Sequence, residues 1–338
     1  MLRPLPGDMR TEEKSMKQFD VVAMGELLID FTENGTSSQG NPLLEANPGG
    51  APCNVLAMLA KLGKSTAFIG KVGSDQFGSQ LKDTLRAVGI DMRGLVTDPV
   101  VHTTLAFVHT LPDGDRDFSF YRDPGADMML TAQELAPGLV EQAKIFHFGT
   151  LSMTHDGVRA ATLCALDRAR EAGVKVSFDP NLRPPLWSSM ELAKECMGLG
   201  MSRCDYLKIA DNEVRFFTGT EDCEEGVRLI RERYPNISVL FLTLGPDGSR
   251  AYCRGLRAEQ PGFVVGTVDT CGAGDTFCGC ALGYLLDHDP DRLTQSQLEE
   301  LLRFANAAAA LVTTKKGAIR SMPERWQIDA LLNAPAGH

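Results

Sequence analysis

The chain has 338 residues, with 34 Lys and Arg against 44 Asp and Glu, which gives a net charge of −10 at pH 7. Hydrophobic residues make up 43%, ordinary for a globular protein and too many for a chain whose main state is disordered. The negative balance disfavours nucleic acid and anionic membranes as partners, because affinity for phosphate backbones needs a concentrated positive field. No apolar run reaches the ~18–20 residues of a membrane span.

Neither end of the chain has the pattern of a folded or a targeting segment. Residues 1–18 contain acids and lack the apolar core of a signal peptide, so we expect a flexible tail there and another at 331–338. The nine cysteines are scattered and form no C-x-x-C pair, which favours small core residues in a reducing compartment. We therefore expect a cytoplasmic protein with one main domain over residues 19–330.

Apolar strands alternate with amphipathic helices along this domain. The expected strands are 19–28, 66–72, 145–149, 174–179, 206–209 and 239–244. The expected helices are 54–62, 76–88, 157–172 and 224–234, and glycine follows the first three, as it does at many helix ends. This alternation predicts an α/β fold with a doubly wound, mostly parallel sheet and helices on both faces.

Two segments, at about 30–45 and 103–125, interrupt the alternation. The first has no helical pattern. In the second, two β-rich runs are joined by a loop that contains Asp113-Gly114, and Asp-Gly between such runs is a hairpin signal. We expect the two segments to form a small antiparallel sheet that projects from the main domain. Beside the carboxyl ends of parallel strands, such a sheet can act as a lid over a ligand crevice.

The segment 269–277, DTCGAGDTF, carries the strongest chemical signal. The backbone N–H groups of Gly272, Ala273 and Gly274 can converge on an anion, and the start of the following helix adds its positive end. Asp275 places a carboxylate at the same point. Phosphoryl transfer needs such a pairing, because the amides stabilise charge while the carboxylate accepts a proton. A glycine-rich turn with Asp275 as a helix cap is the structural alternative.

Four further residues fit a ligand with hydroxyl groups. Gly49 and Gly50 allow a ligand to approach the backbone, and Asn54, on the first clear helix, offers both a donor and an acceptor. Asp30 is expected at the end of the first strand, where its carboxylate can chelate sugar hydroxyls. Taken singly, each has an ordinary alternative: a loop with a helix cap, or a turn-forming aspartate.

Together, the GG-x-x-x-N and DTxGAGD motifs resemble those of the ribokinase-like (PfkB) family of sugar kinases, and the resemblance spans residues 19–323. It implies a doubly wound α/β domain with a β-sheet lid. It also implies that Asp275 is the catalytic base and that residues 272–274 form the anion hole for the transferred phosphate. The sugar-hydroxyl ligands would then be Asp30, Gly49, Gly50 and Asn54.

The same resemblance implies ATP as the phosphate donor, together with Mg²⁺. The positions that match the family's nucleotide side are Thr243, Gly245, Gly248 and Asn306. A plain β-turn is the alternative for the segment around Gly248, since Pro-Asp-Gly is a good turn sequence.

Ion binding is the point at which the sequence departs from the family. The family's N-x-x-E motif helps to hold Mg²⁺ and phosphate through water, but Ala210 stands here where Asn is expected, while Glu213 is in place. We expect Lys208 or Asp211 to compensate. Family members often bind K⁺ near the anion hole, and the matching positions are Asp269, Gly317 and Ser321.

Within the family the chain most resembles the fructokinases, in the strings 120–128, 179–187 and 313–319. Arg122 ends a lid strand, where its side chain can reach the sugar or help to close the lid. Arg183 follows a main-sheet strand and faces the crevice, where its guanidinium can pair with phosphate oxygens. A surface ion pair is the structural alternative for each arginine. The expected reaction is transfer of the γ-phosphate to a primary hydroxyl of D-fructose, giving fructose 6-phosphate.

Alternatives remain open from the sequence. A 2-keto-3-deoxygluconate kinase also carries Tyr-Arg in its lid, with arginines directed at the substrate carboxylate. Ribokinase and a non-catalytic regulatory member of the fold are further alternatives. The edges of the lid strands favour pairing, so a homodimer through the lid is a possible assembly. No nucleic-acid or membrane partner is expected.

Overall fold

The computed structural model describes residues 17–110 and 116–334. Most of the expected N-terminal tail and the turn at Asp113-Gly114 lie outside them. At the other end, helix α9 (Arg325–Asn333) continues beyond the expected domain boundary at residue 330. Within the described ranges no helix is long and apolar enough to cross a membrane, and all nine cysteines are free.

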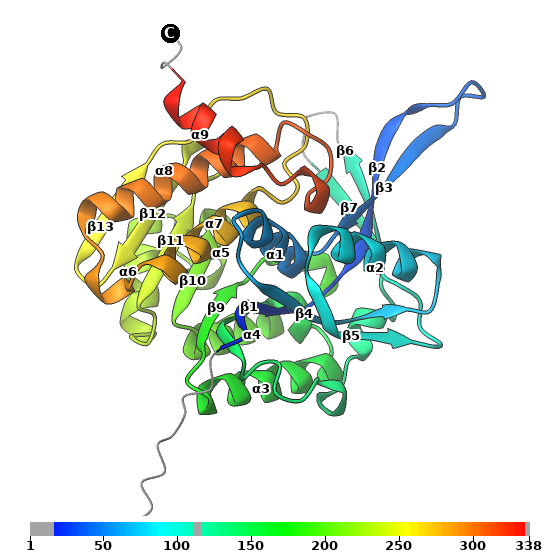
Figure 1. Cartoon of the computed structure of the whole chain (residues 1–338), viewed down its shortest axis with the longest axis horizontal. Helices are drawn as coiled ribbons and strands as arrows, with labels where there is room; N and C mark the ends of the chain where they lie inside the picture. Colours follow the sequence, from blue (N-terminus) through cyan, green and yellow to red (C-terminus); the bar gives the residue numbers. More distant parts are fainter. Residues whose placement is uncertain (1–16, 111–115, 335–338) are drawn as a thin grey trace, which may run out of the picture.

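A nine-stranded sheet forms the centre of the molecule, in the order β13-β12-β11-β10-β9-β8-β1-β4-β5 (Figure 1). The strands from β11 to β5 are parallel, so their carboxyl ends lie along one edge, while β12 and β13 pair antiparallel beside β11. The strands are β1 (Phe19–Met24), β4 (Thr66–Gly73), β5 (Asp91–Asp98), β8 (Ala143–Gly149), β9 (Lys175–Asp179), β10 (Tyr206–Ala210), β11 (Val239–Thr243), β12 (Ser249–Cys253) and β13 (Leu256–Gln260).

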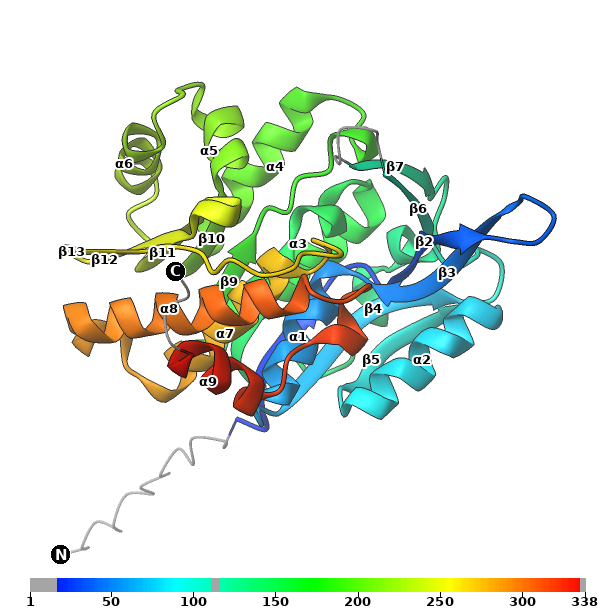
Figure 2. The ribbon, with the colours of Figure 1, turned by 90° about the horizontal axis from the view of Figure 1, so that it is seen from above.

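Helices cover both faces of this sheet, each over its own apolar core (Figure 2). The first face carries α9 with α1 (Ala51–Lys61), α2 (Gln76–Val88), α7 (Ala273–Asp287) and α8 (Gln295–Val312). The second carries α3 (Asp156–Glu171), α4 (Met190–Arg203), α5 (Asp211–Thr218) and α6 (Cys223–Arg233). The prediction of a doubly wound, mostly parallel α/β fold is therefore confirmed.

A separate four-stranded sheet, which we call the lid, has the order β3-β2-β6-β7. Its strands are β2 (Leu28–Thr36), β3 (Pro42–Gly49), β6 (Leu105–Thr110) and β7 (Arg116–Tyr121). The expectation of a purely antiparallel sheet was wrong, because β2 and β6 run parallel, with Ile29 opposite Leu105. Each hairpin is antiparallel, but the chain passes through the main domain between them, so the two hairpins join side by side in the same direction.

The first strand also ends earlier than expected, which moves Asp30 from the main sheet into the lid. Strand β1 stops at Met24, and Asp30 is the third residue of β2. The chain turns at Gly25, whose φ is 156°, and at Glu26, whose buried carboxylate accepts the N–H of Ala51 at 2.8 Å. The apolar pattern conceals this break because the residues on both sides of it are buried.

The end of helix α2 tests whether glycine is needed there for its left-handed backbone conformation. Gly89 closes α2 with a left-handed φ of 86°, and a Cβ there would meet no atom within 4 Å. Gly89→Ala should therefore lower the free energy of unfolding by about 1 kcal/mol, through backbone conformation alone. Gly255→Ala is the matched control, since that glycine is equally open and has no left-handed φ. Urea unfolding of both variants checks this, and equal losses would contradict the explanation.

Candidate active site

The first turn of α7 holds Asp275, the residue that the motif predicts to be the catalytic base. Asp275 lies there with only 9% of its surface exposed. Burial, together with the nearby charge of Asp179, raises the pKa of Asp275 to about 6, although Asn54, Lys208 and Arg183 oppose the rise. A carboxylate with this pKa is ionised at neutral pH and still basic enough to accept a proton during a reaction.

Asn54 on α1 is the direct partner of this base. Its Nδ2 donates to Asp275 Oδ2 at 2.7 Å, while its Oδ1 is buried without a hydrogen-bond partner. Helices α1 and α7 can come close at Gly279 because glycine has no Cβ. An added Cβ would lie 2.8 Å from Met58 Cβ and 2.9 Å from the Val55 carbonyl oxygen. A buried acceptor left unpaired is costly, and this oxygen is available to a donor such as a ligand hydroxyl.

The expected anion cradle lies beside this pair. Gly272 caps α7 with a left-handed φ of 76°, and Ala273 and Gly274 begin the helix. The N–H of Ala273 donates to the Thr270 carbonyl at 3.3 Å, while that of Gly274 lies in the first turn, where backbone donors have no intrahelical partner. A Cβ placed on Gly274 would be 3.0 Å from Lys208 Nζ, so the ammonium lies directly against the cradle. An anion bound here would meet helix amides and a fixed positive charge together.

Lys208 is held in place by Asp179, which ends strand β9. The Nζ of Lys208 lies 3.0 Å from Asp179 Oδ2 and donates to Oδ1 at 3.3 Å, with both side chains buried. Burial alone would lower the pKa of Lys208, but Asp179, Glu213 and Asp275 raise it above its usual value. Lys208 is therefore charged, and the three buried carboxylates around it leave an excess of negative charge that favours a cation.

Glu213 occupies its expected place but is engaged by the backbone. Its Oε2 accepts the N–H of Ala210 and its Oε1 accepts that of Leu182, at 2.8 and 2.7 Å. Burial raises its pKa, and Lys208 opposes the rise. Within the described residues no three His, Cys, Asp or Glu side chains converge to hold a metal ion directly. A Mg²⁺ ion at these residues would therefore be held through water and substrate phosphate.

The lid contributes Asp30 and Gly49 from neighbouring strands. A Cβ at Gly49 would lie 2.1 Å from Asp30 Oδ2, so only glycine leaves room for this carboxylate. Gly50 follows at the N-terminus of α1, with a left-handed φ of 119°. The predicted sugar ligands therefore lie in succession between the lid and Asp275: Asp30, Gly49, Gly50 and Asn54.

The two predicted substrate arginines have different surroundings. Arg183 lies close enough to Asp275 to lower the pKa of that carboxyl group. Arg122 is instead buried in protein contacts, and its guanidinium binds Asp127, Thr154 and the Leu151 carbonyl. The structure therefore brings Arg183 near Asp275 and holds Arg122 at the foot of the lid.

The expected nucleotide residues lie beyond the end of β11. Thr243 ends that strand, and Gly245 and Gly248 bracket a 3₁₀ turn. Asn306 on α8 is used internally: its Oδ1 accepts from Ser249, and its Nδ2 donates to the carbonyls of Gln260 and Pro261. Both donors of this amide are therefore occupied, and Asn306 fixes the strands that border the turn rather than presenting donors to a base.

The expected potassium residues come together at the start of the 269–277 motif. Asp269 Oδ2 accepts the N–H of Gly317 at 2.9 Å, and its Oδ1 accepts that of Cys271 at 2.8 Å. Ser321 donates to the carbonyl of Lys316 at 2.6 Å. This loop also contacts the lid, since Lys316 Nζ donates to the carbonyl of Glu33 at 3.0 Å.

Sequence reasoning missed Asp179 and His147. Asp179 pairs with Lys208, and His147 contacts Ser177 Oγ at 3.0 Å beneath it. Burial lowers the pKa of His147 to about 4, so the imidazole is neutral. A charged residue at the end of an otherwise apolar strand was the available signal for Asp179. No local pattern distinguishes His147 from a core histidine.

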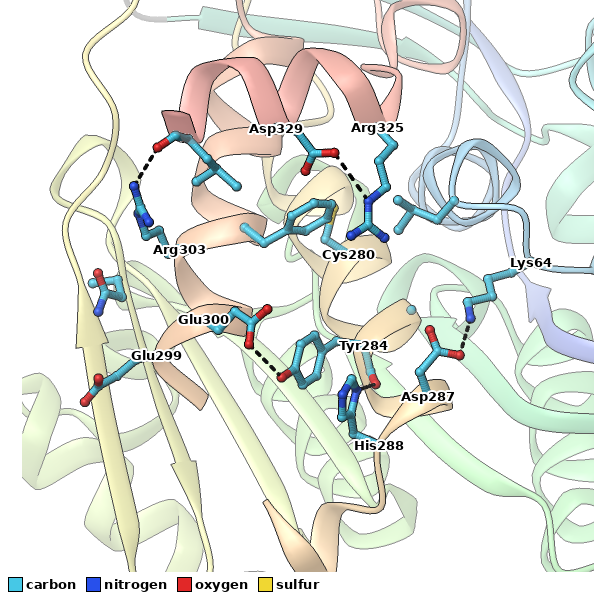
Figure 3. A pocket seen from close by; sticks show the side chains of 15 residues that line it. Lys64, Cys280, Tyr284, Asp287, His288, Glu299, Glu300, Arg303, Arg325 and Asp329 are labelled. Atoms are coloured by element: carbon cyan, nitrogen blue, oxygen red, sulfur yellow. Dashed lines mark hydrogen bonds and ion pairs between the residues drawn. The ribbon is translucent and has the colours of Figure 1, made fainter. Parts of the chain in front are cut away.

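A cavity of about 490 Å³ lies elsewhere, at the opposite end of α7 (Figure 3). Its lining includes Tyr284 and His288, whose rings stack 4.0 Å apart, with Arg303 from α8 and Arg325 from α9. Their polar groups turn to protein partners, such as the Leu332 carbonyl for Arg303. The cavity is separate from the Asp275 site.

Comparison with known proteins agrees with this geometry. The model of the pfkB family carbohydrate kinases matches residues 18–325. Fructokinase-1 of rice (Oryza sativa subsp. japonica) is 42% identical over 316 residues, which cover 93% of this chain and 98% of the relative. The fructokinase of Xylella fastidiosa, solved with bound ATP, superposes with a TM-score of 0.84 at 31% identity, covering 93% of this chain and 98% of that one. A fructokinase double mutant of Vibrio cholerae O395, solved with fructose, ADP and potassium ion, gives a TM-score of 0.83 at 30% identity, covering 93% and 99%. The chain belongs to the pfkB family of carbohydrate kinases.

Proposed function

We propose that this protein transfers the γ-phosphate of ATP to a primary hydroxyl of D-fructose, giving fructose 6-phosphate. The observation that carries the proposal is the buried Asp275, paired with Asn54 at the mouth of a helix N-terminal anion cradle. The fructokinase relatives and the ATP- and fructose-bound neighbours support the same substrates.

The reaction divides between two sets of residues. Asn54 and the lid carboxylate Asp30 orient the sugar, and Asp275 accepts the proton of the attacking hydroxyl. The amides that begin α7 and the ammonium of Lys208 stabilise charge on the transferring phosphoryl group. Closure of the lid over the sugar would exclude water and limit wasteful hydrolysis of ATP.

The position of Arg122 favours fructose over 2-keto-3-deoxygluconate. A substrate carboxylate needs a cationic partner, and the keto-deoxy acid alternative assigned that role to both Arg122 and Arg183. Arg122 is neutralised by Asp127, which leaves Arg183 as the arginine near the base. An uncharged sugar needs no such partner.

The ion requirements follow from charge and geometry. The carboxylates of Asp179, Glu213 and Asp275 outnumber the ammonium of Lys208, so MgATP is the expected donor, with Mg²⁺ held through water and phosphate. Bound Mg²⁺ would supply a positive counter-charge for the ATP phosphates. We also propose K⁺ at the Asp269, Gly317 and Ser321 loop. Nine free cysteines agree with a cytoplasmic location.

Asp275→Asn tests the base. Turnover should fall on the order of 10²-fold or more, because the amide cannot accept the proton. In the wild-type protein, kcat/KM for fructose should be level above about pH 6 and fall below it, as the raised pKa of Asp275 predicts. A coupled ADP-release assay across pH measures both. Asp222→Asn, at a surface helix cap, is the matched control. Near-normal turnover in Asp275→Asn would refute the assignment.

Lys208→Met tests the buried ammonium. Since Lys208 lowers the pKa of Asp275, its loss should move the acidic limb of the pH profile to higher pH. It should also reduce kcat on the order of 10²-fold, as for removal of one charge-stabilising group. Lys71→Met is the control, because that lysine is also buried between two carboxylates, Asp98 and Glu134, but outside the site. If both variants show the wild-type profile, Lys208 has no role in transfer.

We further propose that the lid pairs with a second copy of the chain. One lid face carries stacked Phe31 and Phe107, with Tyr121 beside them at 67% exposure. Tyr121→Glu should convert a dimer to monomer in light-scattering chromatography, while Val100→Glu, at another exposed apolar residue, should not. A wild-type monomer would overturn this assembly.

A further inference from the structure

Four chain segments connect the lid to the main domain, in the described parts of the chain. Two lie together, the turn between β1 and β2 and the step from β3 to α1. The other two are residues 99–104, which lead into β6, and residues 122–125, which follow β7. Any motion of the lid relative to Asp275 must bend these segments, so the contacts among them determine where the lid lies.

Arg122 is the centre of the second pair of segments. Its Nε donates to Asp127 Oδ2 at 2.8 Å, and its Nη2 lies 2.6 Å from the same oxygen. Its Nη1 donates to Thr154 Oγ1 at 2.8 Å, and its Nη2 donates to the Leu151 carbonyl at 3.0 Å. The side chains of Arg122 and Asp127 are only 3% and 2% exposed. Each of the three guanidinium nitrogens therefore has a partner, and together these contacts join the end of β7 to the main domain.

Asp127 extends this joint to the strand that enters the lid. Its Oδ1 accepts the hydroxyl of Thr104 at 2.5 Å, and the carbonyl of Thr104 accepts the N–H of Ile29 in β2. The N–H of Ala126 also donates to the carbonyl of His102. One carboxylate thus links the segments before β6 and after β7, and through Thr104 it reaches β2.

Glu26 completes the base of the lid from the other pair of segments. Its Oε1 accepts the N–H of Ala51 and so ties the β1–β2 turn to the start of α1, next to Gly50. Burial raises the pKa of Glu26 to about 7, and the charges of Asp127 and Arg122 both act on it. Glu26 therefore lies near the Arg122–Asp127 pair, and the two joints occupy one buried region.

We propose that Arg122 and Asp127 form an ionic joint that positions the lid over the sugar, and that Arg122 is a positioning residue rather than a substrate ligand. The joint acts through Thr104 and β2, the strand that carries Asp30. The inference rests on the proposed phosphorylation of fructose, because its effect is on how that sugar is enclosed.

The first experiment separates sugar binding from chemistry. Arg122→Met/Asp127→Leu removes both charges together, because a single replacement would leave the other charge buried and unpaired. Thr104→Val is a milder second variant that keeps both charges and breaks the link to β6. In the double variant the KM for fructose should rise about tenfold, while the KM for ATP changes less than about twofold, as for loss of substrate positioning. ATP hydrolysed per sugar phosphorylated should also rise.

The second experiment distinguishes positioning from contact. Deoxyfructoses that each lack one hydroxyl are compared in wild-type and double-variant protein. If Arg122 bound a hydroxyl, the penalty would vanish for the analogue without that hydroxyl, and the proposal would be overturned. A similar penalty for every analogue supports the joint, as does a smaller penalty of the same kind in Thr104→Val.

The third experiment does not depend on turnover. Amide hydrogen exchange in the ligand-free double variant should be faster in β2 and β6 than in the wild type, with exchange in β9 and β10 unchanged. Unaltered exchange in the lid, or a wild-type KM for fructose, would overturn the joint. Absence of fructose turnover in the wild-type protein would instead overturn the proposed function, and the exchange result would still decide the joint.

Discussion

A single buried ammonium allows three carboxylates to share the carboxyl end of this sheet. Lys208 contacts Asp179 directly, and its charge opposes the rise that burial causes in the pKa values of Glu213 and Asp275. Even so, negative charge remains in excess, and the pKa of Asp275 stays raised by burial and by Asp179. The base strength of Asp275 and the affinity of the site for a cation have the same electrostatic origin.

The replacement of the family's Asn by Ala210 has a simple physical explanation. An asparagine there would supply a polar side chain, but the backbone N–H of Ala210 already satisfies one oxygen of Glu213, and Leu182 satisfies the other. Glu213 is therefore oriented by main-chain groups that any residue provides.

The alternation of strands and helices was enough to predict the main sheet, because periodicity in buried segments is a local property of the sequence. The DTCGAGD motif was equally informative, since a turn, a helix start and a carboxylate are all encoded within seven residues. The strand that carries Asp30 was predicted wrongly, and the partner of Arg122 was not predicted, for a different reason. The break at Gly25 and Glu26 lies between two apolar segments that are both buried, so the pattern continues across it. The partner of Arg122 depends on the folding of the 122–127 turn, which no spacing rule describes. Asp179 and His147 become distinctive only once β9 lies beside β8 and β10.

Helices α1 and α7 carry Asn54 and Asp275, the pair proposed to position and deprotonate the sugar, and they touch along Gly279, where no side chain fits between them. The separation of Asn54 from Asp275 is thus set by atomic volume one helical turn away, at residues that take no part in the chemistry. The close packing of α1 against α7 at Gly279 therefore determines how precisely Asn54 and Asp275 are placed for the proposed proton transfer. A single methyl group added at Gly279 would push the two helices apart. It would displace Asn54 from Asp275 without removing any functional group.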